Sequence, residues 1–348
     1  MAIEMPISDI VLCSQVPSVA GVISEEQVIE TAQSIADLQL DNGMILWFES
    51  GHSDPWNHVE AAMALSAAGF YSEAEKAYDW LACAQLPDGS WYNYYLESAV
   101  EDYRRDTNVC AYIATGVWHH YLITGDDNFL LKMWESVESA LDFVVALQRV
   151  DGGVTWSIEP DGTLGKYALL TGSSSIHKSI ECGLAIASSL GKEKPQWLRA
   201  KSLLARAIAS DPYAFEPKER WAMDWYYPIL SGALDIEAAS LLLAEKWDLF
   251  VVEGVGVKCV SDQPWVTAAE TAECVIALDG LGMTAEALEL FSWIQFMRSQ
   301  DGAYWTGWVI PDKVHFPGGE RTSYTSAAVI LAAYALSSDD KCAGLFRI

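Results

Sequence analysis

The chain has 348 residues, of which 51% are hydrophobic, and its 21 Lys and Arg against 48 Asp and Glu give a formal net charge of −27. The apolar share is enough for a large core and excludes a disordered chain, while the negative charge disfavours nucleic acid and anionic membranes as partners. The 15 Trp and 15 Tyr residues suit flat, partly apolar ligands such as sugars or isoprenoids.

The N-terminal segment and the cysteines carry little chemistry of their own. Residues 1–22 contain Glu4 and Asp9 but no basic stretch. We expect them to be an N-terminal extension of one domain that spans residues 1–348, and not a signal peptide. The seven cysteines are widely spaced without a Cys-x-x-Cys pair, which predicts reduced thiols and no zinc site. Because no apolar run reaches the roughly 18 residues of a membrane span, we expect a cytoplasmic protein. We also expect it to have no metal and no cofactor.

Apolar positions that recur at three- and four-residue spacing predict twelve helices. Glycines such as Gly51, Gly125, Gly172 and Gly282 mark their ends. In chain order, the predicted helices cover residues 25–40, 57–69, 71–86, 107–123, 127–149, 174–190, 194–210, 225–235, 236–248, 266–281, 284–299 and 323–337. A short strand is predicted over residues 255–260.

A repeated turn follows four of these helices and consists of a glutamine, an Asp- or Asn-Gly pair and a tryptophan. The four copies run from Gln39 through Gly43 to Trp47, from Gln85 through Gly89 to Trp91, from Gln148 through Gly152 to Trp156, and from Gln300 through Gly302 to Trp305. The spacing predicts helical hairpins, with two degenerate units near residues 212 and 262. The expected fold class is all-α, an (α/α)6 toroid of six helical hairpins, because an open solenoid would leave both terminal hairpins with bare apolar faces.

The even-numbered helices have the smaller and more apolar residues, so we expect them to form the inner ring with all N-termini at one mouth. Four of these six N-termini carry a carboxylate next to aromatic or hydroxyl side chains. The candidate ligand-binding residues are His52, Asp54, Trp56, His58, Asp106, Asn108, Ser174, Asp224, Trp225, Tyr226, Tyr227, Trp265, Glu270, Trp305 and Tyr324. Helix capping explains any one of the carboxylates. If all four were only caps, however, the exposed aromatic surface beside them would have no binding role to account for it.

Carboxylates in an aromatic cleft are typical of glycoside hydrolysis. The reaction needs one protonated carboxylic acid for the leaving oxygen and one ionised carboxylate that activates water or attacks the anomeric carbon. Burial next to tryptophan raises the pKa of one carboxyl group, while amides at a helix N-terminus keep the other ionised. Flat faces for stacking on sugar rings are expected from Trp56, Trp225, Tyr226, Trp265 and Trp305.

Five runs of the sequence carry a family resemblance: residues 51–62, 106–108, 223–228, 264–267 with Glu270 and Thr271, and 304–307. They resemble an actinobacterial group of toroids of similar length that is often labelled prenyltransferase-like. The mycobacterial endomannosidase that cleaves methylmannose polysaccharide is similar to this group. The resemblance implies a glycoside hydrolase in which Asp54 and Glu270 are the catalytic pair and in which Asp106 and Asp224 bind the substrate.

We expect Glu270 to be the general acid, because it lies one turn inside a helix beside Trp265, where burial raises a carboxyl pKa. Asp54 lies on a polar loop with His52 and is the expected base, although these two roles can be exchanged. The expected substrate is an α-linked oligo- or polysaccharide, above all a mannan with or without methyl groups, and the expected stereochemical outcome is inversion.

Two other functions stay open at this stage. The Gln-Gly-Trp turns also resemble those of terpene cyclases and protein prenyltransferases, so an isoprenoid transferase or cyclase is one alternative. The chain has neither an Asp-x-Asp-Asp nor an Asp-Asp-x-x-Asp motif, however, and the Asp126-Asp127 pair has no third carboxylate at the required spacing. The second alternative is a sugar-binding toroid without catalysis, and the oligomeric state is open.

Overall fold

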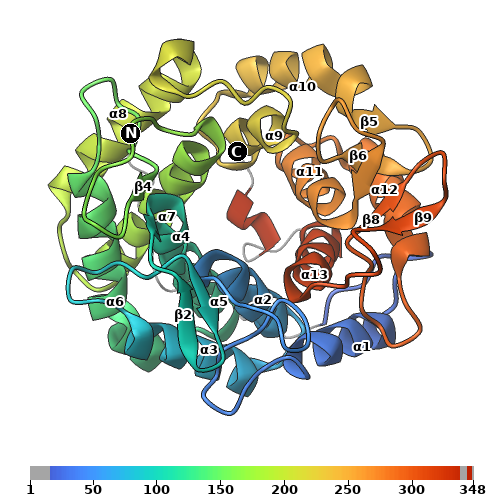
Figure 1. Cartoon of the computed structure of the whole chain (residues 1–348), viewed down its shortest axis with the longest axis horizontal. Coiled ribbons are helices and arrows are strands. Elements are labelled where there is room, and N and C mark those ends of the chain that lie inside the picture. The colour runs from blue at the N-terminus through green and yellow to red at the C-terminus, as the bar shows by residue number, and fades with distance from the viewer. Residues whose placement is uncertain (1–15, 338–342, 347–348) are drawn as a thin grey trace.

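An outer helix followed by an inner helix is the unit of this structure, and the units follow one another around a closed ring (Figure 1). The structure is a computed structural model that describes residues 16–337 and 343–346. Most of the expected N-terminal extension, with Cys13, and also Cys342 lie outside the described residues. The five cysteines within them are free.

The outer helices are amphipathic and bury one side only. In α1 the buried residues are Val28, Thr31, Ala32 and Ile35, which is the i, i+3, i+4, i+7 pattern of a helix lying on a core. The outer helices are α1 (Glu25–Ala36), α3 (Tyr71–Ala84), α6 (Asp127–Ala146), α8 (Pro195–Ser210), α10 (Ile236–Phe250) and α12 (Thr284–Trp293).

The inner helices are buried on nearly all sides, as in α13, where twelve of fifteen residues are buried. They are α2 (Pro55–Ala67), α4 (Thr107–Ala111) with its continuation α5 (Ile113–Thr124), α7 (Leu170–Ser189), α9 (Met223–Leu230), α11 (Ala268–Gly280) and α13 (Ser323–Ser337). Each packs on the next, and α13 packs on both α11 and α2, which closes the ring. The expected alternation of inner and outer helices is therefore present in the described part of the chain.

The repeated turn joins each outer helix to the next one around the ring. Gln39 Nε2 donates to the carbonyl oxygen of Gly43 within its own turn (3.1 Å) and to that of Glu73 in α3 (2.9 Å). Gln85 makes the same pair of bonds to Gly89 and to Ser136 in α6. The glutamines thus satisfy carbonyl groups on two neighbouring units at once.

The last copy of the turn closes the outer ring, and its alignment is corrected by the structure. The position of the glutamine is taken by Arg298, not by Gln300: its Nη2 donates to the carbonyl oxygen of Gln27 in α1 (3.2 Å). Thr31 Oγ1 of α1 donates to the carbonyl oxygen of Gly302 (2.8 Å). The last turn, residues 298–302, is therefore hydrogen-bonded to the first helix, α1, in the way that the other turns are bonded to the next outer helix.

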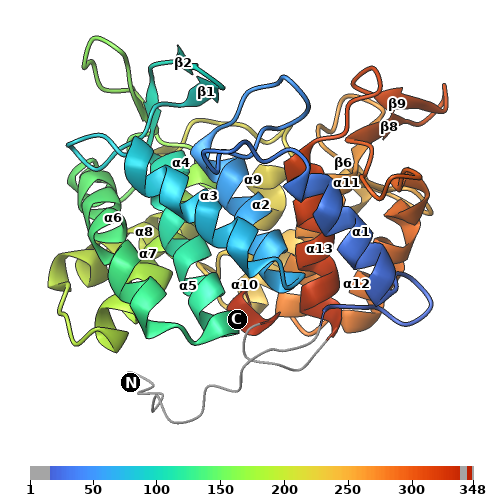
Figure 2. The same ribbon diagram turned by 90° about the horizontal axis from the view of Figure 1, so that it is seen from below.

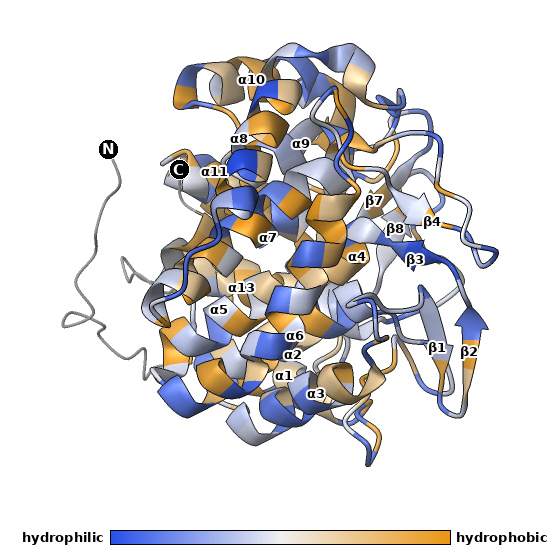
Figure 3. Ribbon diagram, turned by 90° about the vertical axis from the view of Figure 1, so that its left-hand side faces the viewer, coloured by the Kyte–Doolittle hydropathy of each residue, from blue (hydrophilic) through white to orange (hydrophobic). Residues whose placement is uncertain are grey.

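Short strands in the loops make the expectation of an all-α fold too strict. Two strand pairs are formed by β1 (Tyr94–Leu96) with β2 (Ala99–Asp102) and by β3 (Arg105–Asp106) with β4 (Ser157–Ile158). A five-stranded antiparallel sheet has the order β5 (Val251–Val252), β6 (Gly256–Lys258), β7 (Trp265–Thr267), β8 (Gly307–Val309), β9 (Val314–Phe316). The strand predicted over 255–260 is confirmed by β6. All of these strands lie on one side of the ring (Figures 2 and 3).

Some helix limits differ from the predicted ones for local reasons. The helix predicted over 57–69 begins two residues earlier, because Asp54 is its N-cap and Pro55 takes the first helical position. The first two residues of the helix predicted over 266–281 belong to β7 instead. Short 3-10 turns follow three helices: η2 (Pro212–Ala214), η3 (Ile294–Met297) and η4 (Ala343–Phe346).

The side of the ring away from the strands is occupied by the C-terminal turn η4, which lies in the centre of the ring in Figure 1 and at its lower end in Figure 2. Lys178 Nζ of α7 donates to the carbonyl oxygen of Leu345 in this turn (3.3 Å). None of the helices described is both long enough and apolar enough to cross a lipid bilayer.

Candidate active site

The N-termini of the inner helices open on the side of the ring that carries the strands and long loops (Figure 2). Asp54 caps α2 and Asp106 caps α4, each by accepting hydrogen bonds from backbone N–H groups of the first turn. Glu270 and Asp224 lie in the first turns of α11 and α9. The four carboxylates expected at the mouth are therefore at its helix ends, where the positive end of each helix favours a negative charge.

Asp54 is a buried carboxylate that is surrounded by donors. Its Oδ1 accepts from the backbone N–H groups of Trp56 (2.9 Å) and Asn57 (3.1 Å). Its Oδ2 accepts from Trp47 Nε1 (2.7 Å) and Asn57 Nδ2 (2.6 Å). Burial raises the pKa of Asp54, and these hydrogen bonds act against that shift. Because all four neighbouring groups are donors, a proton on the Asp54 carboxyl group would have no acceptor, so these surroundings favour the ionised form.

Glu270 has the opposite surroundings. Its Oε2 is buried and has no hydrogen-bond partner among the described residues. Burial is the main cause that raises the pKa of Glu270 above its usual value, and hydrogen bonds from the Thr267 side chain and from the Glu270 backbone act against that shift. A desolvated carboxyl group with a free oxygen favours the protonated form and can offer its proton to a ligand.

The two helices that begin at these carboxylates, α2 and α11, are the inner helices that pack on α13. The Trp47 ring, which donates to Asp54, lies 5.7 Å from the ring of Tyr324 in α13. Tyr324 in turn is close enough to Glu270 for the charge of that carboxylate to raise its pKa further, after burial. Trp47 and Tyr324 thus connect the surroundings of Asp54 and Glu270.

A cavity of about 320 Å³ lies next to this pair, over the starts of α4, α7 and α9. Asp106, Asn108 and Asp224 are in its wall. Burial raises the pKa of Asp106 to about 6, and the charge of the nearby Asp54 contributes to this shift. Asp224 Oδ1 accepts from Thr171 Oγ1 (2.5 Å) and from the Thr171 backbone N–H (3.2 Å).

Some of the candidate residues have buried polar atoms without a hydrogen-bond partner in the described part of the protein. Within the described chain, five candidates each have a buried nitrogen or oxygen that forms no hydrogen bond: His52 Nε2, Trp56 Nε1, Asn108 Oδ1, Ser174 Oγ and Glu270 Oε2. Buried polar groups are normally paired, and unpaired ones require an explanation. Hydroxyl groups of a sugar, each both donor and acceptor, would satisfy both kinds of atom.

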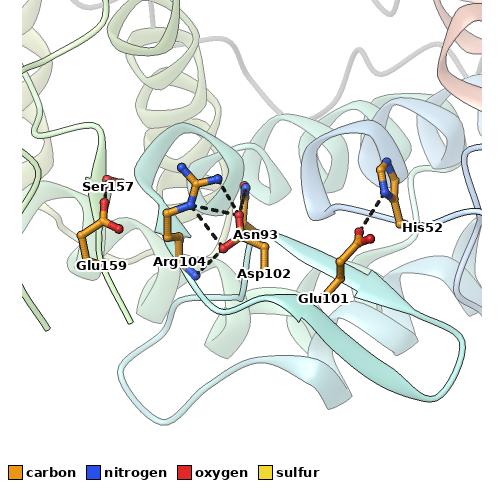
Figure 4. A network of polar contacts seen from close by, with 7 residues as sticks. All are labelled: His52, Asn93, Glu101, Asp102, Arg104, Ser157 and Glu159. Carbon is orange, nitrogen blue, oxygen red and sulfur yellow. Dashed lines mark hydrogen bonds and ion pairs between the residues drawn. The ribbon is translucent and has the colours of Figure 1, made fainter. Parts of the chain in front are cut away.

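The rim of the mouth is held by ion pairs from the β1–β2 hairpin (Figure 4). His52 Nδ1 lies 2.9 Å from Glu101 Oε2. Arg104 Nη2 lies 2.6 Å from Asp102 Oδ2, and its hydrogen bonds are the main cause that lowers the pKa of Asp102 to about 2. Asn93 Nδ2 donates to the same carboxylate (2.9 Å). His52 is therefore fixed at the rim with its Nε2 left for another partner.

Two of the candidate residues do not face the mouth, and the prediction that they bind substrate is wrong. His58 is 1% exposed, accepts from the backbone N–H of Ile45 (3.1 Å) and lies 2.9 Å from the carbonyl oxygen of Ala77 in α3. Trp225 is fully buried, and its Nε1 donates to the carbonyl oxygen of Leu242 in α10 (3.1 Å). Both side chains fasten an inner helix to an outer one.

The remaining aromatic candidates lie at two depths. Trp265 on β7 stacks on Phe316 with ring centroids 4.5 Å apart, and Trp305 stacks on His315 at 4.1 Å, so each keeps at most one free face at the rim. Deeper in the ring, Trp56 stacks on Tyr112 at 4.8 Å. The hydroxyl groups of Tyr226 and Tyr227 are further inside and donate to Glu273 (2.6 Å from Tyr227). Tyr226 is fully buried, so the prediction that its ring stacks on a sugar is wrong.

Glu60 and Glu273 were missed at the sequence level. Both are buried below the mouth, and Tyr112 donates a short hydrogen bond to Glu60. Burial raises the pKa of Glu60 to about 7 and that of Glu273 to about 8. A signal for Glu273 was present, because it follows Glu270 by three residues and so lies on the same face of the helix. Glu60 stands alone in an apolar helix, a position that by itself calls for a partner.

A bacterial mannosidase is similar to the chain over nearly its full length. The MMP endo-(1,4)-3-O-methyl-alpha-D-mannosidase of Mycolicibacterium hassiacum is 50% identical over 332 residues, which cover 95% of this chain and 92% of that protein. An uncharacterized glycosyl hydrolase of Methanocaldococcus jannaschii is 23% identical over 166 residues, 46% of this chain and 26% of that protein. No protein-family model matches the chain. The first comparison confirms the resemblance inferred from the sequence.

Solved structures share the ring. A wild-type glycosidase superposes with a TM-score of 0.71 at 14% identity, over 92% of this chain and 97% of that one. A GH63 mannosylglycerate hydrolase from Thermus thermophilus has a TM-score of 0.68 at 12% identity, over 88% and 98%. A D-mannose isomerase also reaches 0.68 at 12% identity, over 89% and 96%. Because an isomerase shares the ring with hydrolases, the fold alone does not decide the reaction.

Proposed function

The chain belongs to the glycoside hydrolase family of the M. hassiacum endomannosidase, and on this premise we propose that it hydrolyses an α-linked mannan whose mannose residues carry O-methyl groups. The observation that carries the proposal is the contrast between two carboxylates at one mouth. Asp54 accepts four hydrogen bonds, whereas Glu270 has a buried oxygen that no described residue contacts by a hydrogen bond.

In the proposed reaction Glu270 gives its proton to the glycosidic oxygen, and the bond between that oxygen and the anomeric carbon breaks. A water molecule on the opposite face of the sugar bonds to the anomeric carbon and gives its proton to Asp54. The Asn57 amide is the donor to Asp54 that this water replaces, because it is held by a rotatable side chain. Exchange of one proton with solvent at each carboxyl group then restores the starting state.

This assignment of the two roles follows from the hydrogen bonds. A general acid needs a proton and an oxygen that is free to deliver it, which fits Glu270 and not Asp54. The sugar is proposed to contact His52, Trp56, Asp106, Asn108, Ser174, Asp224, Trp265, Trp305 and Tyr324. Tyr226 and Tyr227 are proposed to act indirectly, by holding Glu273 in place with their hydrogen bonds below the mouth. A cytoplasmic location stays a prediction.

The test of the catalytic pair uses Asp54→Asn and Glu270→Gln, with turnover of an O-methylated α-mannan followed by release of reducing ends. Each variant is expected to fold and to lose turnover by a factor of about 10³ or more, because a general acid or base contributes about 10²–10⁴ and water activation fails without it. Asp126→Asn is the matched control. Asp126 caps the outer helix α6 in the same way, by accepting from Asn128 (2.8 Å) and Phe129 (3.3 Å).

Asp126→Asn is expected to keep the wild-type rate. Wild-type turnover in Asp54→Asn or in Glu270→Gln would remove the residue concerned from the mechanism. Binding of the mannan without any release of reducing ends by the wild type would favour the alternative of a non-catalytic sugar-binding toroid.

Inversion at the anomeric carbon is the expected stereochemical outcome, since a water molecule attacks from the face opposite the leaving oxygen. Proton NMR of the first product formed from an α-linked substrate is expected to show the β-anomer before mutarotation. Initial appearance of the α-anomer would mean retention, and with it a covalent intermediate on Asp54.

The isoprenoid alternative has less support from the interior of the ring. Below the mouth, the space between the inner helices holds the carboxyl groups of Glu60 and Glu273 and the hydroxyl groups of three tyrosines. A lining of carboxyl and hydroxyl groups, paired with one another, is not the apolar lumen that an isoprenoid chain would need.

A further inference from the structure

The cavity over the starts of α4, α7 and α9 is separate from the carboxylate pair, since neither Asp54 nor Glu270 is in its wall. Its volume of about 320 Å³ is at the lower end of the about 300–1,000 Å³ of small-molecule sites. That size suits a single sugar residue. Asp106 relates the cavity to the mouth, because it is in the cavity wall and caps α4, which packs on the helix α2 that Asp54 caps.

Most of the cavity lining is apolar, which is unusual for a site that binds a polyhydroxylated sugar. Val154, Leu169, Ile176 and Met223 supply this part of the wall. Ile176 is almost fully buried, whereas Leu169 and Met223 are only partly covered by the protein. The apolar wall is therefore built on the inner ring and is available to a ligand.

Polar groups stand in the same wall. Asn108 Oδ1 is buried and without a hydrogen-bond partner in the described chain, and it accompanies the carboxylates of Asp106 and Asp224. Trp156 is held in place from two sides: its backbone N–H donates to Tyr167 (3.1 Å), and its carbonyl oxygen accepts from the Thr107 N–H (2.9 Å). The cavity thus combines hydrogen-bonding groups, an ordered tryptophan and an apolar wall.

We propose that this cavity is a sugar subsite beside the cleaved bond, and that its apolar wall selects a mannose residue carrying an O-methyl group. The proposal rests on the proposed mannan substrate and adds the place where methylation is recognised. A methyl ether removes one O–H donor and adds one methyl group. An unmethylated sugar would therefore bury a hydroxyl against Leu169 and Met223 without a partner, while the methyl ether gains apolar contact.

The test is a binding measurement, so that it does not depend on hydrolysis. Calorimetry is done in the Glu270→Gln background with two probes, an α-1,4-linked mannotetraose carrying 3-O-methyl groups and the same tetraose without them. The methylated probe is expected to bind about 10–200-fold more tightly, the range for one methyl-sized group in an apolar pocket. Leu169→Asn is expected to reduce this ratio about 10-fold or more, because it places an amide in the apolar wall.

Leu169→Asn is chosen because Leu169 is the N-cap residue of α7 and makes no capping hydrogen bond, and asparagine is a good N-cap. Leu198→Asn is the matched control, since Leu198 is 58% exposed on the outer helix α8; it is expected to leave the ratio unchanged. Equal affinity for the two probes in the Glu270→Gln background, or an unchanged ratio in Leu169→Asn, would overturn the subsite.

The failures of the two proposals can be told apart. Hydrolysis by the wild type together with an unchanged ratio in Leu169→Asn would leave the hydrolase standing and remove the subsite. A preference for the methylated probe that Leu169→Asn abolishes, in a wild-type protein that cleaves neither probe, would leave the subsite standing and remove the hydrolase.

Discussion

Glu60 and Glu273 are carboxyl groups that the folded protein keeps out of water. They are 5% and 6% exposed, and their hydrogen bonds come from the hydroxyl groups of Tyr112, Tyr226 and Tyr227. Burial is the main cause that raises both pKa values, and the charge of Glu60 raises that of Glu273 further, to about 8. At neutral pH we therefore expect Glu273 to be protonated, which keeps a negative charge away from the neighbouring Glu270.

A stability difference between wild type and Glu273→Gln tests this protonation. The folded protein holds a proton on Glu273 that the unfolded chain loses above its usual pKa of 4.5, so stability is highest at low pH and is lost as pH rises toward about 8. Between about pH 6.5 and 8.5, urea unfolding of the wild type should lose roughly 1–2 kcal/mol more than that of Glu273→Gln. The pKa of His58 is lowered by burial to about 4, so its contribution to pH dependence lies below this range.

Glu286→Gln, a change at an exposed position of α12, is the control and is expected to follow the wild type. Equal pH slopes for the wild type and Glu273→Gln would mean that Glu273 is ionised in the folded protein.

At the scale of the elements, the Gln-Gly-Trp turn is a joint between neighbouring outer helices. Gly89 has a φ of +88°, and a Cβ there would lie 2.2 Å from the carbonyl oxygen of Ser139 in α6. Gly43 meets Lys76 of α3 in the same way, at 2.2 Å. The repeated glycine is therefore required twice, by its backbone conformation and by the close approach of the next helix.

The two requirements can be separated by Gly89→Ala and Gly162→Ala. Gly162 has nearly the same φ of +87° but nothing within 4 Å of its Cβ position. Gly162→Ala should cost about 1 kcal/mol of unfolding free energy for the left-handed conformation, and Gly89→Ala at least about 2 kcal/mol more for the overlap with α6. Urea denaturation measures both, and similar losses would contradict close packing of the turn on α6.

The helices could be predicted from the sequence because their apolar spacing and caps are local. Apart from β6, the strands could not, because each has only two to four residues and its pairing depends on distant segments, as in β7 with β8, where Trp265 is opposite Val309. The same difference explains the binding residues. Asp54 and Asp106 could be found as caps, whereas the direction of Trp225 depends on α10, which covers it.

Neighbouring residues of one helix cannot all face the same opening, and this limited the predicted site. Successive side chains turn by about 100°, so Trp225 has different surroundings from Tyr226 and Tyr227. The first reaches α10, while the other two reach Glu273. Applied to α11, the same rule would have identified Glu273 one turn after Glu270.

For the whole molecule, the formal charge of −27 has two consequences. Like charges repel one another across the surface and lower stability at low ionic strength. A neutral polysaccharide is not repelled, whereas a polyanionic one would be, so the charge is compatible with a neutral mannan.

Salt is therefore expected to stabilise the protein and to leave its affinity for the mannan nearly unchanged. Raising NaCl from about 10 to about 150 mM shortens the screening length from about 30 to about 8 Å, and we expect the melting temperature to rise by about 2 °C or more. Differential scanning calorimetry measures this shift. KCl at equal ionic strength serves as the control and should act equally, and a fall in melting temperature would show that attractive ion pairs outweigh the repulsion.

The position of η4 determines how a polymer can pass through the site. The turn lies at the end of the ring opposite the mouth, where Lys178 of α7 donates to the carbonyl oxygen of Leu345. We therefore expect a polysaccharide to reach the carboxylates from the mouth alone. Both fragments are then expected to leave on the same side, so that each cleavage ends one binding event and short products compete with intact polymer.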